Sequence, residues 1–346
     1  MQLLRAFAPF TREILKIDIH AHFFPTIGKE EAESFMFAKP PWLNINGDDS
    51  AMMMDGDTEY RFVQSPLWDP VGRLKEMDDN EIDVQIISPT PLLFSYTSDP
   101  KNVARWSARI NDFGAASCEA NPQRLYSLCQ VPLQDFDQAR IEVSRSMAAG
   151  HVGVHLGTHV NGRNFDDPEM IRFLHYCATE GIPVLIHPWD MMAPERMPKY
   201  MLQWLVGMPA ETHLSILSLI LSGAFERLPT DLKVCFAHGG GSFAMLLGRL
   251  DNAWHRHELV RQDCPRPPSE YVQRFSVDSA VFDDKTLKFL LDVMGDTRVM
   301  MGSDYPFPLG EIHPGEMIKN SELIDDTTKQ AVLYDNAANF FGITND

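Results

Sequence analysis

The chain has 346 residues, of which 44% are hydrophobic, and its formal net charge is −18 at pH 7. This length suits one large α/β barrel or two ordinary domains, and the acidic balance argues against nucleic-acid and membrane-surface partners. No uninterrupted apolar run reaches the roughly 18 residues of a membrane span. The five cysteines form no CxxC pair, which is typical of reduced thiols, so we expect a cytosolic protein.

The first 15 residues, MQLLRAFAPFTREIL, carry Arg5 and Arg12 before the first acidic residue, Glu13. Arginine before acid is a weak feature of organelle-targeting peptides. The apolar core and small-residue cleavage site of a secretory signal are missing. We therefore interpret this segment as an N-terminal arm on a cytosolic protein.

Eight short apolar segments are predicted strands: residues 14–23, 83–90, 125–132, 151–157, 182–188, 232–240, 275–281 and 298–306. The amphipathic stretches between them often begin at Asp or Asp-Pro, and two end in Gly, as capped helices do. Eightfold alternation of strand and helix predicts a (β/α)8 TIM barrel. We expect one barrel domain over 1–346.

Two connections exceed the usual loop length. Residues 24–68 follow the first predicted strand, and residues 189–228 follow the fifth, with the rest of the barrel at 69–346. Both leave from the carboxyl ends of strands, where a parallel barrel keeps its active site. We expect both segments to form lids or walls of that site.

Histidine and aspartate recur where predicted strands end. His20 and His22 are two apart on the first strand, so their side chains point the same way. His187 ends the fifth strand, His238 the sixth and Asp304 the eighth. Because these ends meet at one mouth of a barrel, imidazoles and a carboxylate would converge there. This donor set suits Zn²⁺ or another divalent ion, with one position open for water.

The distribution of lysines bears on the number of metals. Barrels with two metals commonly bridge them with a carboxylated lysine at the end of the fourth strand, but no lysine occurs between Lys101 and Lys199. We therefore predict one metal ion per subunit, with His238 left free as the acid/base group. The predicted ligands are His20, His22, His187 and Asp304.

The remaining histidines have more ordinary interpretations. His155 alternates with glycines and is expected to fill the barrel interior, and His159 is expected to form a hydrogen bond in a loop. His255 and His257 lie two apart on a probable helix, so they do not share a face and are expected to be solvated. The glycines after His238 are expected to let the backbone pass close to the metal site rather than to bind a phosphate.

Several motifs resemble the amidohydrolase superfamily, within its decarboxylase branch. They are KIDIHAH, FSY at 94–96, GVHLGTHVNG, HPWDM, WLVGMPAE, KVCFAHGGGSF and GSDYPFPLGE. The resemblance extends over essentially the whole chain after residue 15. The resemblance implies zinc bound by the four predicted ligands and His238 as the essential catalytic histidine. It also implies a homodimer.

By the same resemblance, Arg61 in the 24–68 insertion matches an arginine that grips a substrate carboxylate. Arg249 matches an arginine supplied across the dimer interface, and Trp204 and Phe307 match aromatic residues of the pocket. The implied activity is non-oxidative decarboxylation of a small dicarboxylate carrying an enamine and an aldehyde, with Asp304 also moving a proton. Addition of water and direct protonation stay open as routes.

Three alternatives also stay open. The same donor set serves zinc decarboxylases of hydroxylated aromatic acids, and it serves hydrolases of amides or lactones, because both reactions use an activated water. A non-enzymatic barrel stabilised by its metal is the third, although the uncommitted His238 argues against it.

Overall fold

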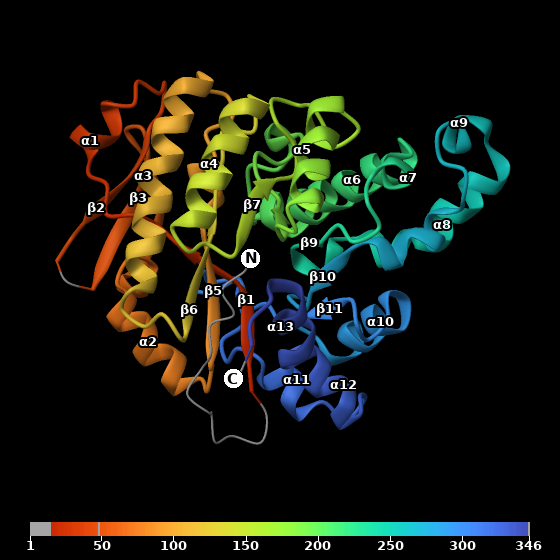
Figure 1. The fold of residues 1–346 in the computed structure, drawn as a ribbon. Helices are drawn as coiled ribbons and strands as arrows, with labels where there is room; N and C mark the ends of the chain where they lie inside the picture. The colour runs from red at the N-terminus through yellow and green to blue at the C-terminus, as the bar shows by residue number, and fades with distance from the viewer. Residues whose placement is uncertain (1–14, 48, 345–346) are drawn as a thin grey trace.

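The computed structural model describes residues 15–47 and 49–344, so the predicted N-terminal arm lies almost entirely outside the described residues. Parallel pairing joins eight strands in the order β1-β5-β6-β7-β8-β9-β10-β11 (Figure 1). All eight predicted strands are present, and each is shorter than predicted. Their bounds are β1 (Ile17–Phe23), β5 (Val84–Pro89), β6 (Leu125–Cys129), β7 (Gly153–Gly157), β8 (Val184–His187), β9 (Val234–Phe236), β10 (Ser276–Asp278) and β11 (Val299–Met300).

The sheet closes between β1 and the segment that follows β11. Ala21 forms a parallel bridge with Tyr305, and the His22 amide donates to the Tyr305 carbonyl at 2.7 Å. The Asp304 amide donates to the His20 carbonyl at 2.9 Å. The predicted TIM barrel is confirmed, and its closure brings His20 and His22 on β1 next to Asp304.

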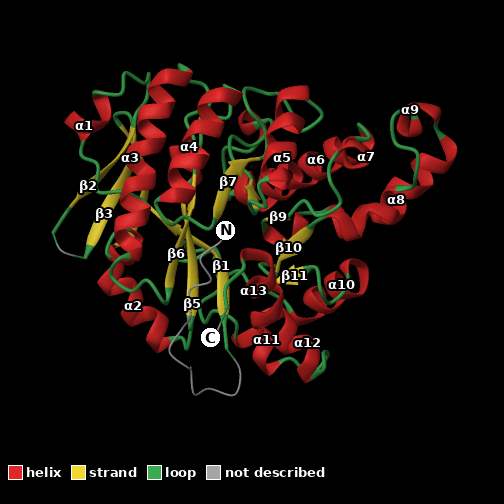
Figure 2. Ribbon diagram, in the orientation of Figure 1, coloured by secondary structure: helices red, strands yellow, loops and turns green. Residues whose placement is uncertain are grey.

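Helices surround the barrel (Figure 2). The predicted aspartate caps are present: the carboxylates of Asp69, Asp99, Asp135 and Asp167 each accept a hydrogen bond from an amide in the first turn of the helix that follows. The helices after the first strand are α1 (Lys29–Glu33), α2 (Pro70–Asp79), α3 (Pro100–Cys118), α4 (Phe136–Ala148), α5 (Pro168–Thr179), α6 (Met208–Leu221), α7 (Ala224–Arg227), α8 (Phe243–Arg256), α9 (Glu258–Arg261), α10 (Asp284–Met294), α11 (Glu316–Asn320), α12 (Asp326–Gln330) and α13 (Asn336–Phe341).

The segment 24–68 contains a small sheet that the sequence patterns did not predict. Strands β2 (Pro41–Ile45), β3 (Ser50–Asp55) and β4 (Thr58–Gln64) pair antiparallel in that order. Met53 is fully buried and lies opposite Arg61 in the β3–β4 pairing. The segment that we expected to form a wall of the site is thus a three-stranded sheet, and the β3–β4 pairing fixes where the Arg61 backbone lies.

Two apolar clusters form the core. The larger packs the helices against the outside of the barrel, and the smaller joins strand residues such as Ile19, Leu185 and Cys235 to the aromatic rings of Phe340 and Phe341 in α13. Because the smaller cluster draws on most of the strands, it fills the barrel interior, and α13 closes the end away from the histidines. The chemistry is therefore confined to one end.

One helical stretch is more apolar than the other helices of the described residues. Residues Gln203–Leu221 are long and apolar enough to cross a membrane, with a mean hydropathy of 1.3, but 44% of this stretch is buried inside the protein. Ile216, Leu219 and Ile220 pack in the larger core cluster, which accounts for this apolarity.

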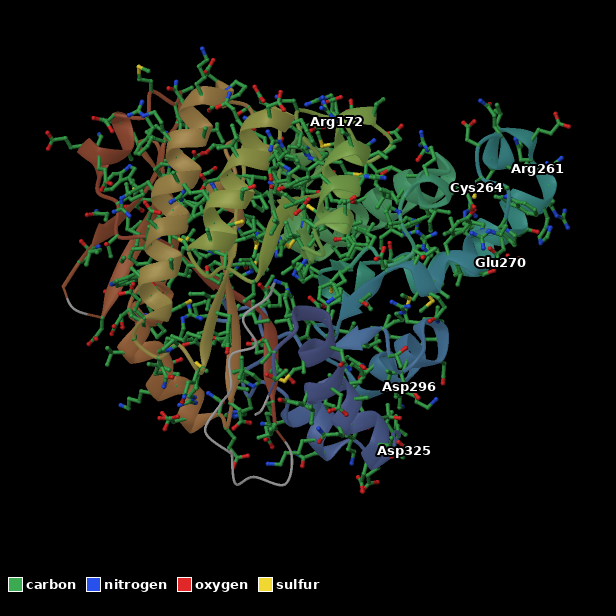
Figure 3. All side chains as sticks on the ribbon, in the orientation of Figure 1. Arg172, Arg261, Cys264, Glu270, Asp296 and Asp325 are labelled. Carbon is green, nitrogen blue, oxygen red and sulfur yellow. The ribbon has the colours of Figure 1, made fainter. Side chains whose placement is uncertain are left out.

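Helices α8 and α9 project away from the barrel, with Arg261 at the far end (Figures 1 and 3).

Candidate metal centre and substrate cavity

A register shift in β1 directs its histidines into the barrel mouth. The pairing of β1 with β5 shifts between Asp18 and Ala21, and a shift of this kind re-aims the side chains that follow it. Ile17 and Ile19 precede the shift and pack in the interior cluster. After it, the Nε2 atoms of His20 and His22 lie 3.1 Å apart. The predicted co-direction of these two rings is therefore confirmed.

Three of the predicted imidazoles are held through their Nδ1 atoms. His20 Nδ1 lies 2.6 Å from the Asp278 carboxylate, and His187 Nδ1 lies 2.8 Å from the Pro188 carbonyl. His22 Nδ1 lies 3.3 Å from the Ser88 hydroxyl, which itself donates to the Ala21 carbonyl. These partners assign the ring proton to Nδ1 in each case, which leaves the Nε2 lone pairs free to bind a cation.

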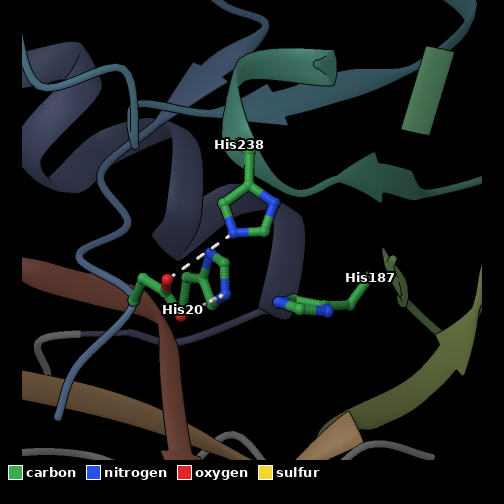
Figure 4. Close-up of side chains that lie close together, drawn as sticks. His20, His187 and His238 are labelled. Carbon is green, nitrogen blue, oxygen red and sulfur yellow. Dashed lines mark ion pairs between the residues drawn. The ribbon is translucent and has the colours of Figure 1, made fainter. Parts of the chain in front are cut away.

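The free donors converge on one point with a carboxylate. Asp304 Oδ1 lies 3.2 Å from His22 Nε2 and 3.5 Å from His20 Nε2. The rings of His20 and His187 lie 5.0 Å apart, and His187 Nε2 is buried with no hydrogen-bond partner. Figure 4 shows the His20, His187 and His238 rings facing one another. A buried lone pair without a partner among imidazoles and a carboxylate fits a bound divalent cation.

His238 lies close enough to the other donors to be a candidate metal ligand itself. Ligand atoms of His20, His187, His238 and Asp304 all lie within 4.8 Å of one another. His238 Nε2 is 3.7 Å from Asp304 Oδ2, and neither of its ring nitrogens has a hydrogen-bond partner. The site thus contains five potential donors when His22 is included, so four ligands would leave one group free.

The electrostatics of the centre keep the His22 and His187 imidazoles neutral at pH 7. Burial lowers the pKa of His22 to about 4 and lowers the pKa of His187 well below its usual value. Burial alone would also lower the pKa of His20, but the hydrogen bond and charge of Asp278 outweigh it and raise this pKa to about 9. Burial opposes ionisation of Asp304, yet the neighbouring His22 and His238 side chains hold its pKa well below the usual range. The neutral His22 and His187 rings and the ionised Asp304 carboxylate are the forms in which these groups bind metals, whereas His20 releases a proton when it binds one.

Asp278 is the functional residue that sequence reasoning missed. It is fully buried at the end of β10, and its Oδ1 accepts the Gly239 amide at 2.8 Å while its Oδ2 contacts His20. Gly239 has a φ of 61°, and a Cβ there would lie 2.5 Å from Val281. The close backbone approach expected of the glycines after His238 is therefore present. The motif FSVDSAV carried a signal, because its Asp also falls at a strand end.

A cavity of about 500 Å³ opens above the centre. His22, His187 and Asp304 line its floor, and Arg61, Trp204 and Phe307 line its sides. The Arg61 guanidinium carbon lies 5.3 Å from the Trp204 ring centre and 4.9 Å from the Phe307 ring centre. The His22 and Phe307 rings are 5.2 Å apart, so the guanidinium lies one ring away from the histidine cluster. This volume is in the usual range for a small-molecule site.

The other predicted residues lie away from the metal-type donors or beside them without joining the set. Arg249 is exposed on α8 and is absent from the residues that line the cavity of its own chain. His155 is buried beside the His22 and His187 rings, and His159 Nε2 lies 3.2 Å from the Asp190 carbonyl in a loop, both as predicted. His255 and His257 are exposed, also as predicted.

Comparison with known proteins shows which family the chain belongs to. The amidohydrolase family model matches residues 17–343. The chain is 40% identical over 334 residues to the 2-amino-3-carboxymuconate-6-semialdehyde decarboxylase of Dictyostelium discoideum, covering 95% of this chain and 92% of that protein. It is 29% identical over 289 residues to the gamma-resorcylate decarboxylase of Rhodococcus jostii, covering 78% and 86%.

A solved structure has the same fold. The dihydroxybenzoic acid decarboxylase of Polaromonas, described with bound manganese and the inhibitor 2-nitroresorcinol, superposes with a TM-score of 0.76 at 22% identity, covering 95% of this chain and 97% of that one. The family model over residues 17–343 and the 40% identical relative show that the chain belongs to the amidohydrolase family. Within that family it is an enzyme of the decarboxylase branch, a carboxy-lyase.

Proposed function

We propose that this enzyme converts 2-amino-3-carboxymuconate 6-semialdehyde to 2-aminomuconate 6-semialdehyde and CO₂, a step of tryptophan catabolism by the kynurenine pathway. The observation that carries the proposal is one cavity with a cluster of metal-type donors on its floor and a carboxylate-binding group, Arg61, on its side. The relative from Dictyostelium, 40% identical along nearly the whole chain, is named for this reaction. The substrate loses its 3-carboxylate as CO₂ and gains one proton at C3.

We infer that His20, His22, His187 and Asp304 hold one Zn²⁺ per subunit. Three buried Nε2 lone pairs and a carboxylate suit a borderline ion, and both Zn²⁺ and Mn²⁺ accept such donors. Manganese is described for the Polaromonas enzyme, so the choice of Zn²⁺ rests on the histidine-rich donor set. When bound, such an ion lowers the pKa of a coordinated water and withdraws charge from substrate oxygens.

His238 is the proposed acid/base group. Its two ring nitrogens have no partner among the described residues, and Nε2 faces Asp304 Oδ2 at 3.7 Å. A proton can therefore be taken up at Nε2 while Asp304 stabilises the imidazolium. Asp304, which also lines the cavity, is proposed to pass a proton to C3 of the substrate. Addition of water to C2 before CO₂ loss and direct protonation of C3 use the same two groups.

Arg61 is proposed to bind a substrate carboxylate. Its planar fork matches a carboxylate, and stacking on Trp204 and Phe307 limits the orientations of that fork. The two rings also exclude water from one side of the bound group. Trp204 and Phe307 are therefore proposed as substrate-binding residues through their effect on Arg61 and on the conjugated chain of the substrate.

We further propose a homodimer in which Arg249 completes the site of the partner subunit. Arg249 lies on α8, which projects from the barrel, and does not line the cavity of its own chain. Met245, one helical turn before it, is 72% exposed, and Leu246 beside it is 37% exposed. Exposed apolar side chains on a projecting helix are typical of subunit interfaces. No nucleic acid or membrane is part of this proposal, and we place the enzyme in the cytosol because the cysteines of the described residues are free.

The test is product analysis with the metal-loaded enzyme. We expect freshly generated aminocarboxymuconate semialdehyde to lose its ultraviolet absorbance with release of one CO₂ per molecule. The second candidate, decarboxylation of a dihydroxybenzoate, is favoured by the 29% identical resorcylate enzyme and is measured on 2,6-dihydroxybenzoate. Faster turnover of that aromatic acid would overturn the proposal, as would hydrolysis of amide or lactone substrates without CO₂.

A companion variant tests the role of His238. His238→Ala should retain metal and release no CO₂, because the four proposed ligands, His20, His22, His187 and Asp304, are unchanged. Near-normal turnover in this variant would remove His238 from the mechanism.

A further inference from the structure

The cavity contains a second cationic side chain that the proposed function does not use. Lys39 lines the cavity together with Arg61. Among the described residues, no other lysine or arginine lines it. Lys39 comes two residues before β2 and lies against the β3–β4 turn. The Gly56 amide in that turn donates to the Pro40 carbonyl at 3.1 Å, and a Cβ at Gly56 would be 3.5 Å from the Lys39 Cα.

The ammonium of Lys39 has no ion-pair partner within 4.0 Å among the described residues, although it is exposed. A nearby lysine behaves differently: Lys29 pairs with Asp57 at 2.6 Å and does not line the cavity. Carboxylates also line the cavity, at Asp55, Asp190 and Asp304. Within one chain, a dianionic ligand therefore meets these three negative side chains and has Lys39 and Arg61 to offset them, in addition to the proposed metal ion and Arg249 of the partner subunit.

The two cations sit at different depths. Arg61 faces Met53 across β3–β4 and stacks on Phe307, which contacts the histidine cluster. Lys39 lies beside Gly56, three residues further along β3 and its turn, a backbone separation of roughly 10 Å. Both side chains have long flexible stems, so their charged groups can reach the same small molecule from two sides. A cavity with two such groups distinguishes ligands with two carboxylates from ligands with one.

We propose that Lys39 determines specificity for dicarboxylates: its ammonium binds the second carboxylate of the substrate while Arg61 binds the first. This inference rests on the proposed function for the identity of the substrate, but the preference for two carboxylates is a property of the cavity itself. Within a single chain, the second positive charge comes from a residue that precedes the β2–β4 sheet.

The experiment compares Lys39→Met, Lys39→Arg and the control Lys29→Met in the metal-loaded full-length enzyme at about 0.15 M salt, where long-range steering is screened. Lys29→Met makes the same change in net charge on the same insertion but outside the cavity. We expect Lys39→Met to raise KM for the semialdehyde about tenfold with little change in kcat, as removal of uniform binding does. Lys39→Arg should recover most of this loss, and Lys29→Met should leave KM unchanged.

A binding measurement separates this inference from the proposed function. Calorimetry with benzene-1,2-dicarboxylate and with benzoate gives the preference of each variant for two carboxylates over one. Lys39→Met should lose roughly tenfold of that preference, since a hydrogen-bonded ion pair contributes this much to binding. Unchanged preference, or an equal loss in Lys29→Met, would overturn the inference. If the wild type shows the preference but does not turn over the semialdehyde, the proposed function fails and the role of Lys39 stands.

Discussion

His20 and Asp278 form the shortest contact of the proposed metal centre, with 2.6 Å between Nδ1 and Oδ2, and both side chains are fully buried. The carboxylate fixes the ring proton on Nδ1 and so presents Nε2 to the cation. Partners of this kind commonly change metal affinity 10–100-fold. The relationship joins β1 to β10, which are far apart in the sequence.

Replacing Asp278 by Asn should therefore weaken metal binding by about 10- to 100-fold while the protein stays folded. The amide can still accept the Nδ1 proton but no longer supplies a charge. Competition with a chelator measures the dissociation constant, and circular dichroism checks the fold. Asp292→Asn, on the surface of α10, is the matched control. An unchanged dissociation constant in Asp278→Asn would show that the contact does not orient His20.

Arg61 should not tolerate lysine. Its guanidinium stacks on two aromatic rings, and an ammonium on a flexible stem reproduces neither the stack nor the planar fork. We expect Arg61→Lys to raise KM by about 10- to 100-fold. Arg105→Lys is the control, because Arg105 lies 5.4 Å from the Phe35 ring outside the cavity. Equal KM values in the wild type and Arg61→Lys would remove Arg61 from substrate binding.

The proposed dimer predicts complementation between two inactive variants. Arg249→Ala and His238→Ala should each be inactive as homodimers. Mixing them should restore about a quarter of wild-type activity, because half of randomly paired dimers are mixed and each has one complete site. Steady-state CO₂ release after subunit exchange measures this. A mixture that stays inactive although mass spectrometry detects mixed dimers would exclude a contribution of Arg249 across the interface.

Protonation of His151 should lower the free energy of unfolding in mild acid. Burial lowers its pKa below 6.5, although Nε2 contacts the Asn111 carbonyl at 3.0 Å. As the pH falls below 6.5, the unfolded chain takes up this proton before the folded one, so stability is complete above pH 6.5 and is lost below it. His151→Gln should lose less free energy of unfolding between pH 7 and pH 5.5. Urea titrations at the two pH values measure the difference, and parallel losses in both proteins would contradict the assignment.

The strands and the positions of the candidate ligands could be predicted because both depend on local pattern. Apolar runs of the right length mark the strands, and parallel strands bring their carboxyl ends to one mouth, so His20, His187 and Asp304 had to approach one another. The alternation of His20 and His22 was sufficient to predict that both rings point the same way. The metal ligands and the role of His238 remain predictions until a metal is measured.

What the sequence could not give depends on contacts between distant segments. The register shift that re-aims His20 arises only when β1 pairs with β5. The sheet of residues 41–64 was missed because its outer strands, β2 and β4, are only partly buried, which weakens their apolar periodicity. Lys39 was missed for a related reason: only the folding of the β3–β4 hairpin places it beside the cavity.

The central claim is that a cation held by His20, His22, His187 and Asp304 drives CO₂ release. Metal content and CO₂ release, measured on the same samples after chelation and during stepwise return of Zn²⁺, test it most directly. The account predicts that activity rises in proportion to bound metal and levels off at one ion per chain. Release of CO₂ at the full rate by the metal-free enzyme would contradict it.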